Sequence, residues 1–250
     1  LSTNVASITL AANSVIDVAA GGVDQSITLA DTTGDFDLTL TGDSASAVGL
    51  NAVDVDALAV TGTLTLNDNI TVDDSLDLST NVASITLAAN SVIDVAAGGV
   101  NQAITLADTT GNFNLTLTGD SASALGVDGT DVNALTLTGG VLTINGDVES
   151  DGALDFTNVG SITLGGNVLV TSQDSDSGNA AGNITFDSAN VITGANTLAL
   201  DGDTVTLHQV GNGTTDPTQL TVTADTSLSL NADLTIDGAV DLSTNVVALS

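Results

Sequence analysis

The sequence predicts an all-β protein, a parallel β-solenoid whose short strands wind into stacked coils. The first observation is a long repeat, because residues 1–23 return without a change as residues 78–100, an offset of 77. Self-similarity at a fixed period is typical of repeat architectures. The second is a pattern of short apolar–polar–apolar triplets, the signature of strands with one buried face. The third is a scarcity of helix formers other than Ala and Leu, alongside many strand and turn residues such as Thr, Val, Asn, Asp and Gly.

The charge balance limits the partners of the chain. Its 250 residues include no Lys or Arg and 31 acidic residues, of which Glu149 is the only Glu, so the formal net charge is −31. Lys and Arg are the residues that bind phosphate backbones and anionic membrane surfaces, so no nucleic acid partner is expected. Membrane insertion is not expected either, because no apolar run approaches the ~20 residues that span a bilayer. The absence of Cys excludes a disulfide framework.

The first strands recur at a spacing of about one coil. Ile8–Leu10 and Ile27–Leu29 share the pattern Ile-Thr-Leu at an offset of 19. Between them, Val15–Val18 is expected to form a second strand and Ala20–Gly22 a turn. Phe36–Thr41 follows as another strand, bounded by glycines. Alternation within each segment places one face toward a core.

A six-residue spacing follows. Apolar residues lie six apart at Leu58, Leu64, Ile70, Leu76 and Val82, and again at Val222, Leu228, Leu234, Val240 and Val246. Each hexad reads as a strand with two inward residues and then a corner, and three such sides make a coil of about 18 residues. The two spacings together predict ~18–20 residues per coil and four coils in each 77-residue unit.

The long repeat divides the chain into units. We expect solenoid unit 1 at residues 1–77, unit 2 at 78–155, unit 3 at 156–241, and the start of a further unit at 242–250. Unit 3 is longer, and its excess is assigned to a loop at Ser172–Gly182. A second loop at Gly211–Pro217 holds the only Pro. Such insertions sit outside a coil, where binding functions are usually found.

Three later segments carry a resemblance to a known family. Ala181–Phe186, Asn196–Asp201 and Leu220–Ala224 resemble the degenerate β-helix repeats of filamentous-haemagglutinin-like adhesins. The resemblance implies a right-handed β-helix, an extracellular or cell-surface location, and a role in adhesion or in building a surface fibre. The chain departs from the family pattern in its lack of Lys and Arg and in its unusually exact repeats. The hexads alone would also suit a left-handed β-helix.

The Asp residues are candidates for calcium binding, because calcium prefers carboxylate and carbonyl oxygens. Local clusters are Asp73 with Asp74 and Asp77, Asp147 with Glu149 and Asp151, and Asp174 with Asp176. A second group keeps its identity one unit later, as Asp17, Asp31, Asp43 and Asp54 return as Asp94, Asp108, Asp120 and Asp131. The calcium candidates are therefore Asp17, Asp31, Asp43, Asp54, Asp73, Asp74, Asp77, Asp94, Asp108, Asp120 and Asp131.

Other Asp residues are better explained as corner residues. Four of them change to Asn one unit later, since Asp24, Asp35, Asp37 and Asp56 become Asn101, Asn112, Asn114 and Asn133. A charged calcium ligand should not lose its charge so freely. Asp and Asn both suit turns, because their side chains bond their own backbone and tolerate left-handed conformations.

The remaining residues that could carry chemistry favour structural roles. His208 has no companion His or Cys and is expected to be an ordinary strand residue. Phe36 and Phe113 occupy equivalent positions and are expected to fill coil interiors. Thr-x-Thr pairs, which a flat ice-binding face would use, occur at Thr39/Thr41, Thr61/Thr63, Thr136/Thr138 and Thr221/Thr223. Outward Thr is also ordinary on strands.

The sequence therefore favours a structural role over an enzymatic one. We expect the shaft of an extracellular fibre or adhesin, which assembles end to end with its own copies into a stiff anionic filament. The alternative is a calcium-organised surface module that mediates adhesion to cells or matrix, with glycans as further partners. No enzyme is expected, because the aromatic residues are limited to four Phe, cationic side chains are absent, and the Asp residues are spread evenly.

Overall fold

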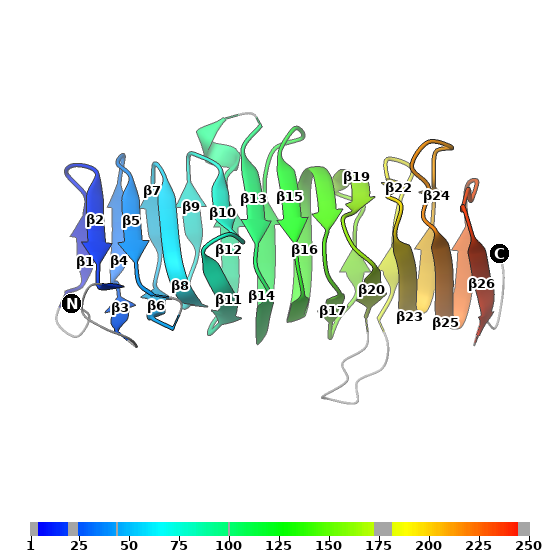
Figure 1. The fold of residues 1–250 in the computed structure, drawn as a ribbon, viewed down its shortest axis with the longest axis horizontal. Helices are drawn as coiled ribbons and strands as arrows, with labels where there is room; N and C mark the ends of the chain where they lie inside the picture. The colour runs from blue at the N-terminus through cyan, green and yellow to red at the C-terminus, as the bar shows by residue number, and fades with distance from the viewer. Residues whose placement is uncertain (1–4, 20–24, 44, 100, 173–181, 245–250) are drawn as a thin grey trace.

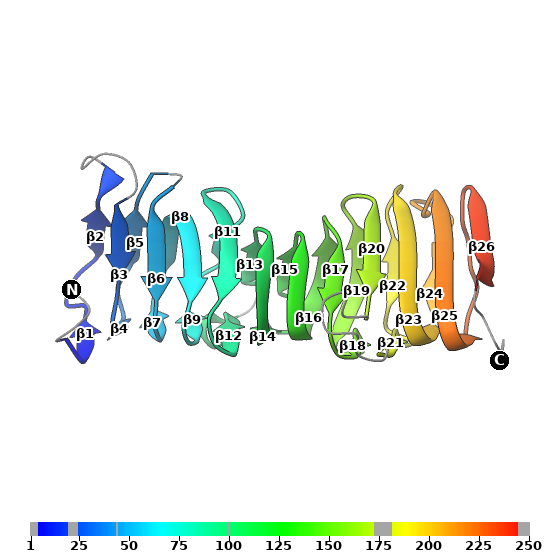
Figure 2. The same ribbon diagram turned by 90° about the horizontal axis from the view of Figure 1, so that it is seen from below.

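The computed structural model describes residues 5–19, 25–43, 45–99, 101–172 and 182–244. They form an all-β parallel β-solenoid of about ten turns, with about 21 residues per turn. The strands stack along one axis, so the described residues form a rod with β1 at one end and β26 at the other (Figures 1 and 2). The named helical element is one 3-10 turn, η2 (Ala96–Gly98), and Ala19 also has 3-10 conformation. The predicted fold class is confirmed.

Each turn has three sides, and equivalent sides of successive turns pair into three parallel ladders. Ladder 1 contains β1 (Ser7–Thr9), β4 (Asp31–Gly34), β7 (Val53–Val55), β9 (Ile70–Val72), β12 (Ser91–Asp94), the end of β14 (Thr109–Thr118), the middle of β16 (Thr130–Ile144), β18 (Leu154–Asp155), β21 (Ile184–Thr185), and the ends of β23 (Thr197–Leu207) and β25 (Gln219–Leu230).

Ladder 2 begins with strands that follow those of ladder 1 along the chain. It contains β2 (Ser14–Asp17), β5 (Leu38–Thr41), the start of β8 (Leu58–Leu66), β10 (Leu76–Leu78), β13 (Ala103–Leu106), β15 (Ala124–Val127), the end of β16, β19 (Val159–Leu164), β22 (Val191–Thr193), β24 (Gln209–Val210) and a bridge at Leu234. Among these described strands, β8 and β10 occupy successive turns without a strand pairing between them, so the ladder has two paired sections.

Ladder 3 completes each turn. It contains β3 (Ser26–Thr28), β6 (Ala47–Leu50), the end of β8, β11 (Val82–Leu87), the starts of β14 and β16, β17 (Val148–Ser150), β20 (Val168–Thr171), the starts of β23 and β25, and β26 (Ala239–Thr244). Long strands such as β8 bend from one ladder to the next. Gly62 makes that bend with φ +128°, and an added Cβ would lie 2.5 Å from the Ser46 carbonyl oxygen.

The length of chain in a turn varies, and this corrects the predicted coil length. On ladder 1, Val53 pairs with Ile70, whereas Leu154 pairs with Ile184, so the second step contains almost twice as much chain as the first. Ile8 pairs with Thr32, so the 19-residue offset between Ile8 and Ile27 is not a stacking distance. The expected coil length is therefore slightly shorter than the observed average, because corners absorb different numbers of residues.

The 77-residue unit does not contain four turns. It passes eleven sides, namely β1 to β10 with β8 counted twice because it lies on two ladders. Eleven sides are three and two-thirds turns. The second copy of the repeat therefore begins one ladder earlier than the first. The Ser-Ile-Thr triplets at Ile8, Ile85 and Ile162 accordingly lie on ladders 1, 3 and 2.

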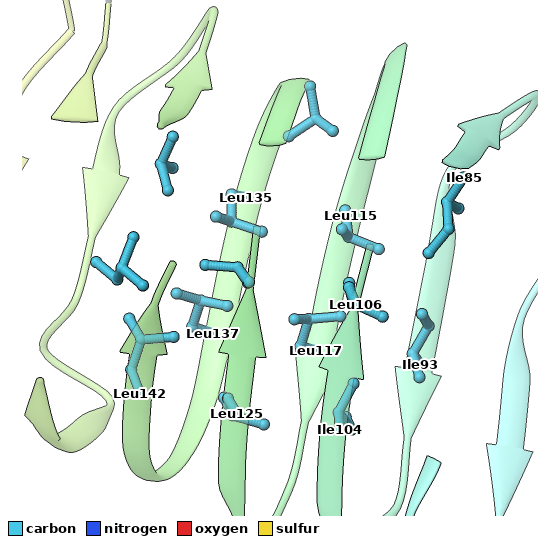
Figure 3. Packing of buried hydrophobic residues seen from close by; sticks show 14 of the residues in the cluster. Ile85, Ile93, Ile104, Leu106, Leu115, Leu117, Leu125, Leu135, Leu137 and Leu142 are labelled. Carbon is cyan, nitrogen blue, oxygen red and sulfur yellow. The ribbon is translucent and has the colours of Figure 1, made fainter. Parts of the chain in front are cut away.

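The interior is a continuous stack of Leu, Ile and Val side chains. Leu115 lies beside Leu135, and Leu117 beside Leu137, on neighbouring turns (Figure 3). All four are at most 4% exposed. Burial of a side chain of this size stabilises the fold by about 1.5–3 kcal/mol. The core is therefore a sum of nearly equal contacts between neighbouring turns.

The aromatic residues are placed differently from expectation. Phe36 is only partly buried against the core, and Phe113 is 37% exposed. The prediction that both fill coil interiors is wrong for Phe113, which lies at a corner of the coil where the pairing register of β14 shifts between Gly111 and Asn114. Instead, Phe156 and Phe186 are buried and stack with ring centroids 4.8 Å apart.

The two expected loops differ in how much of them the structure describes. The loop expected at Ser172–Gly182 lies mostly outside the described residues, but Ser172 and Gly182 join its ends through a 2.7 Å backbone hydrogen bond. In Gly211–Pro217, the buried carboxylate of Asp216 accepts hydrogen bonds from the backbone N–H groups of Asn212 and Gly213. This second loop is therefore held by its own polar groups.

Candidate functional site

Five of the eleven calcium candidates are corner residues that bond their own turn. Asp17 and Asp94 each accept a hydrogen bond from the backbone N–H two residues later. Asp43 and Asp120 do the same, and each also accepts from a Ser hydroxyl. These four are the equivalent pairs of two successive units. This geometry agrees with a role in shaping the corners of the coil, because at least one carboxylate oxygen of each Asp already accepts a hydrogen bond from its own corner.

Asp77 is the most strongly bonded corner residue. Its carboxylate accepts hydrogen bonds from the backbone N–H and hydroxyl groups of Ser79 and Thr80, at 2.7–3.3 Å. Burial tends to raise the pKa of Asp77, but these hydrogen bonds outweigh it and hold the pKa below its usual value. The equivalent Asp155 accepts from the backbone N–H of Thr157.

The other six candidates have exposed side chains. They are Asp31, Asp54, Asp73, Asp74, Asp108 and Asp131. Asp73 and Asp74 lie at the corner after β9, where both backbone N–H groups donate to the Asp56 carbonyl oxygen at 3.0 Å. Partial desolvation and the charges of nearby carboxylates, first that of Asp74, raise the pKa of Asp56. Several carboxylates therefore lie close together at this corner, and the chain has no Lys or Arg that could neutralise them.

A second acidic surface lies on ladder 3. A shallow hollow there is lined by Asp108, Asp131, Asp147 and Glu149, together with Thr and Gly residues. Asp131 pairs directly with Glu149 on the next turn. Asp147 Oδ1 accepts a hydrogen bond from the Leu169 backbone N–H. The expected cluster of Asp147, Glu149 and Asp151 thus contributes two of its members to this hollow.

The described residues contain no group of three or more His, Cys, Asp or Glu side chains arranged to hold a metal ion. The pair Asp174 and Asp176 lies outside the residues that the structure describes. Calcium binding by the eleven candidate Asp residues stays a prediction. The acidic surfaces can attract cations through their charge, whereas a preformed coordination cage is not present in the described part of the chain.

Asn side chains at the corners form hydrogen bonds between successive turns, a role that the sequence analysis did not predict. The side-chain oxygens of Asn13, Asn69, Asn90 and Asn167 each accept a hydrogen bond from a backbone N–H of the following turn. Asp147 acts in the same way. These bonds join consecutive turns at corners, where the strand ladders are interrupted. The sequence signal is an Asn or Asp one residue before a strand, a pattern that also fits an ordinary turn residue.

His208 and the Thr-x-Thr pairs do not form a recognisable site among the described residues. His208 lies partly buried in the single-residue corner between β23 and β24, so it is not within a strand as expected. Thr116 and Thr118 stack on Thr136 and Thr138, but the next turn places Asp155 beside Thr136 on the same ladder. A Thr-x-Thr array of the kind that an ice-binding face needs is thus limited to two turns at this place.

The two ends of the described rod expose apolar surface. At the first turn, an apolar hollow is lined by Val5, Ile8, Leu10, Ile16, Leu29 and Leu38. At the other end, Leu234 and Ile236 are only partly buried and Val240 is 47% exposed. Side chains at equivalent places inside the rod are fully buried. The ends therefore carry the surfaces on which a further turn would pack.

Comparison of the chain with protein-family models, curated protein sequences and solved structures gave no match. The resemblance to adhesin repeats is thus supported at the level of the β-solenoid fold. Among the described residues, none belongs to a helix with the length and apolar character needed to cross a membrane. The class that the fold and its surfaces define is an anionic repeat protein of the β-solenoid type.

Proposed function

We propose that this chain is a segment of the shaft of an extracellular fibre or surface adhesin. The observation that carries the proposal is the stacking of parallel strands from β1 to β26 over one apolar interior. Solenoid stability is a sum of contacts between neighbouring turns, so length can be added without a new core. Such a rod supplies reach and stiffness.

The surface chemistry supports the same role. A net charge of −31 without any cationic side chain keeps the rod hydrated and repels anionic surfaces. The absence of Lys and Arg also removes every trypsin cleavage site. Both properties suit a fibre outside the cell. In this proposal, glycans or other surface partners bind to surfaces that the shaft holds at a distance from the cell.

Two measurements test the shaft proposal. Antibodies raised against the purified chain should label the outside of intact cells of the source organism in immuno-electron microscopy. The purified chain should appear as straight rods that lengthen as the protein concentration rises. Labelling confined to the cell interior, or a globular particle with unchanging sedimentation, would refute the proposal.

The second candidate is a calcium-organised surface module, and one observation favours it. Partial desolvation and then the charges of neighbouring carboxylates raise the pKa of Asp56, and burial and then the charge of Asp225 raise the pKa of Asp201. A divalent cation would relieve such repulsion by bridging carboxylates within or between rods. Calcium at millimolar concentration should then bundle rods, and a chelator should separate them, whereas magnesium should act weakly. Equal scattering in calcium and in chelator would rule out this candidate.

A further inference from the structure

The loop that joins β24 to β25 places an Asn-Gly dipeptide against an acidic side chain (Figure 1). Asn212 Oδ1 accepts hydrogen bonds from the backbone N–H groups of Thr214 and Thr215, at 2.8 and 3.2 Å. The backbone N–H of Gly213 donates to Asp216 Oδ1 at 2.8 Å. These contacts surround an electrophilic carbon, Asn212 Cγ, and the backbone nitrogen that follows it in the chain.

The loop is held at its base, while its tip is open to solvent. The Gly211 N–H donates to the Ile192 carbonyl oxygen on the preceding turn. Asp216 is only 5% exposed, so the surrounding chain fixes the position of its carboxylate. Asn212 and Gly213 are exposed, and a Cβ added at Gly213 would meet no atom within 4 Å. Water can therefore reach the dipeptide, and a small product can leave it.

We propose that Asn212 and Gly213 form a self-modifying site, at which the chain cyclises without an enzyme or a cofactor. The Gly213 nitrogen attacks Asn212 Cγ, and its proton passes to the Asp216 carboxylate. The new C–N bond closes a five-membered succinimide ring, and the side-chain nitrogen takes up the proton and leaves as ammonia. Water then opens the ring, which gives aspartate or isoaspartate at position 212 and adds one carboxylate to the loop.

Three features of the loop favour this reaction. The N–H groups of Thr214 and Thr215 bond the oxygen on which negative charge develops during the attack, as donors do in an oxyanion hole. The Asp216 carboxylate contacts the proton that has to be removed, which is the position of a general base. Gly213 has no side chain to obstruct the attack, and glycine adopts its φ of +76° without strain.

The chain contains one other Asn-Gly dipeptide, Asn145 with Gly146, which serves as an internal control. Asn145 is also exposed. Among the described residues, no N–H group bonds to the side-chain oxygen of Asn145, and no carboxylate accepts from the Gly146 N–H. The nearby Asp128 Oδ1 accepts instead from the Gly129 N–H at 3.1 Å. The two dipeptides therefore share their covalent chemistry and differ in their surroundings.

The test follows both dipeptides in one sample of the folded chain at neutral pH. Digestion with pepsin in acid stops further cyclisation, and mass spectrometry of the peptides separates the asparagine, succinimide and carboxyl forms. General base catalysis accelerates a reaction by about 10²–10⁴-fold, so we expect Asn212 to react at least about tenfold faster than Asn145. In concentrated urea, where the loop is absent, the rate at Asn212 should fall and the two rates should become similar.

Asp216→Asn separates the base from the hydrogen bond, because the amide oxygen still accepts from an N–H group but is not an ionisable base. We expect this variant to lower the rate at Asn212 by at least about tenfold and to leave the rate at Asn145 unchanged. Circular dichroism checks that the variant keeps its strands. If it does not, the folded and urea-unfolded rates of the unaltered chain decide the question.

Two results would overturn the proposal. One is a rate at Asn212 in the folded chain that does not exceed its rate in urea, which would mean that the hydrogen bonds only restrain the loop. The other is a folded Asp216→Asn variant that reacts as fast as the unaltered chain. Neither result bears on the shaft proposal, which surface labelling of cells tests independently.

Discussion

At the scale of single residues, the corner amides have a role beyond making turns. Asn90 Oδ1 accepts a hydrogen bond of 2.9 Å from the backbone N–H of Asn114, one turn further along the rod. A turn residue that also joins two turns restricts how far the corner can move. The acidic residues take part as well, because Asp147 makes the equivalent bond to Leu169.

Removal of one such bond should have a measurable effect. We expect Asn90→Ala to lower the free energy of unfolding by about 1 kcal/mol, the typical net contribution of one hydrogen bond. Asn90→Asp keeps the acceptor oxygen and serves as the matched control. Urea unfolding followed by circular dichroism measures both variants. Equal losses in the two variants would show that the acceptor oxygen is not what matters.

Truncation of a side chain in the interior should lower the free energy of unfolding by more than the loss of one corner hydrogen bond. Leu117 is fully buried, and its replacement by Ala should cost about 2–5 kcal/mol. The same change at Leu169, which is 38% exposed, should cost less than about 1 kcal/mol. Hydrogen exchange should show the loss of protection centred on the turns that contact residue 117. An equal effect of the two substitutions would contradict the assignment of Leu117 to the core.

At the scale of elements, the sequence predicted the strands better than the way they stack. Period-2 triplets such as Ile8–Leu10 and Leu64–Leu66 marked strands correctly. The coil length was underestimated because corners hold different numbers of residues, and the hexads around Leu58–Val82 include the shortest turn on ladder 1. Equal spacing in sequence is therefore not equal spacing around the rod.

The candidate sites were predictable only in part. The equivalence of Asp43 and Asp120 was visible in the repeat, and both make the same turn. The crowding of Asp56 by Asp74 was not visible, because it depends on how many residues a turn contains. The exposure of Phe113 was likewise not visible, because the alternation of apolar residues does not show that this Phe lies at a corner, where the strand register shifts.

Coil length can be tested directly with internal cysteine pairs. The observed turn places Thr86 beside Thr65, whereas the shorter coil that the Ile8 to Ile27 offset suggested would place it beside Asn67. We expect T65C/T86C to form an intramolecular disulfide and N67C/T86C to stay reduced under the same mild oxidation. Mass spectrometry of the alkylated proteins separates the two outcomes. A disulfide in the second variant alone would restore the shorter coil.

At the scale of the whole molecule, uncompensated negative charge dominates the response to pH. The raised pKa values of Asp56 and Asp201 mean that the folded state holds these protons more tightly than the unfolded state. Their ionised forms therefore destabilise the fold, and stability rises as pH falls through those pKa values. Asp77 has a lowered pKa, so its contribution is present above 3.8 and is lost as pH falls through the lowered value.

Thermal unfolding should follow these signs. We expect Tm to rise as pH is lowered from 7 toward 3.8, the ordinary Asp value, and to fall again below it. Asp56→Asn should raise Tm at pH 7 and reduce the gain on acidification, while Asp77→Asn should lower Tm at pH 7. A steady fall of Tm from pH 7 downward would contradict the raised pKa values.

The repeat of eleven sides also determines which face of the rod each copy of a repeated segment lies on. Copies of one surface segment lie on ladders 1, 3 and 2 in turn, so any group carried by the repeat faces three directions along the shaft. A four-turn repeat would instead align all copies on one face. This difference between sequence repeat and structural turn is the central feature of the molecule.

The most direct test is a density map of the chain, by crystallography or electron cryo-microscopy, at a resolution that shows side chains. We expect parallel strands about 4.8 Å apart along the axis, with Ile8, Ile85 and Ile162 on three different ladders. A map that placed these three residues on one ladder, or that lacked the axial strand spacing, would contradict the account.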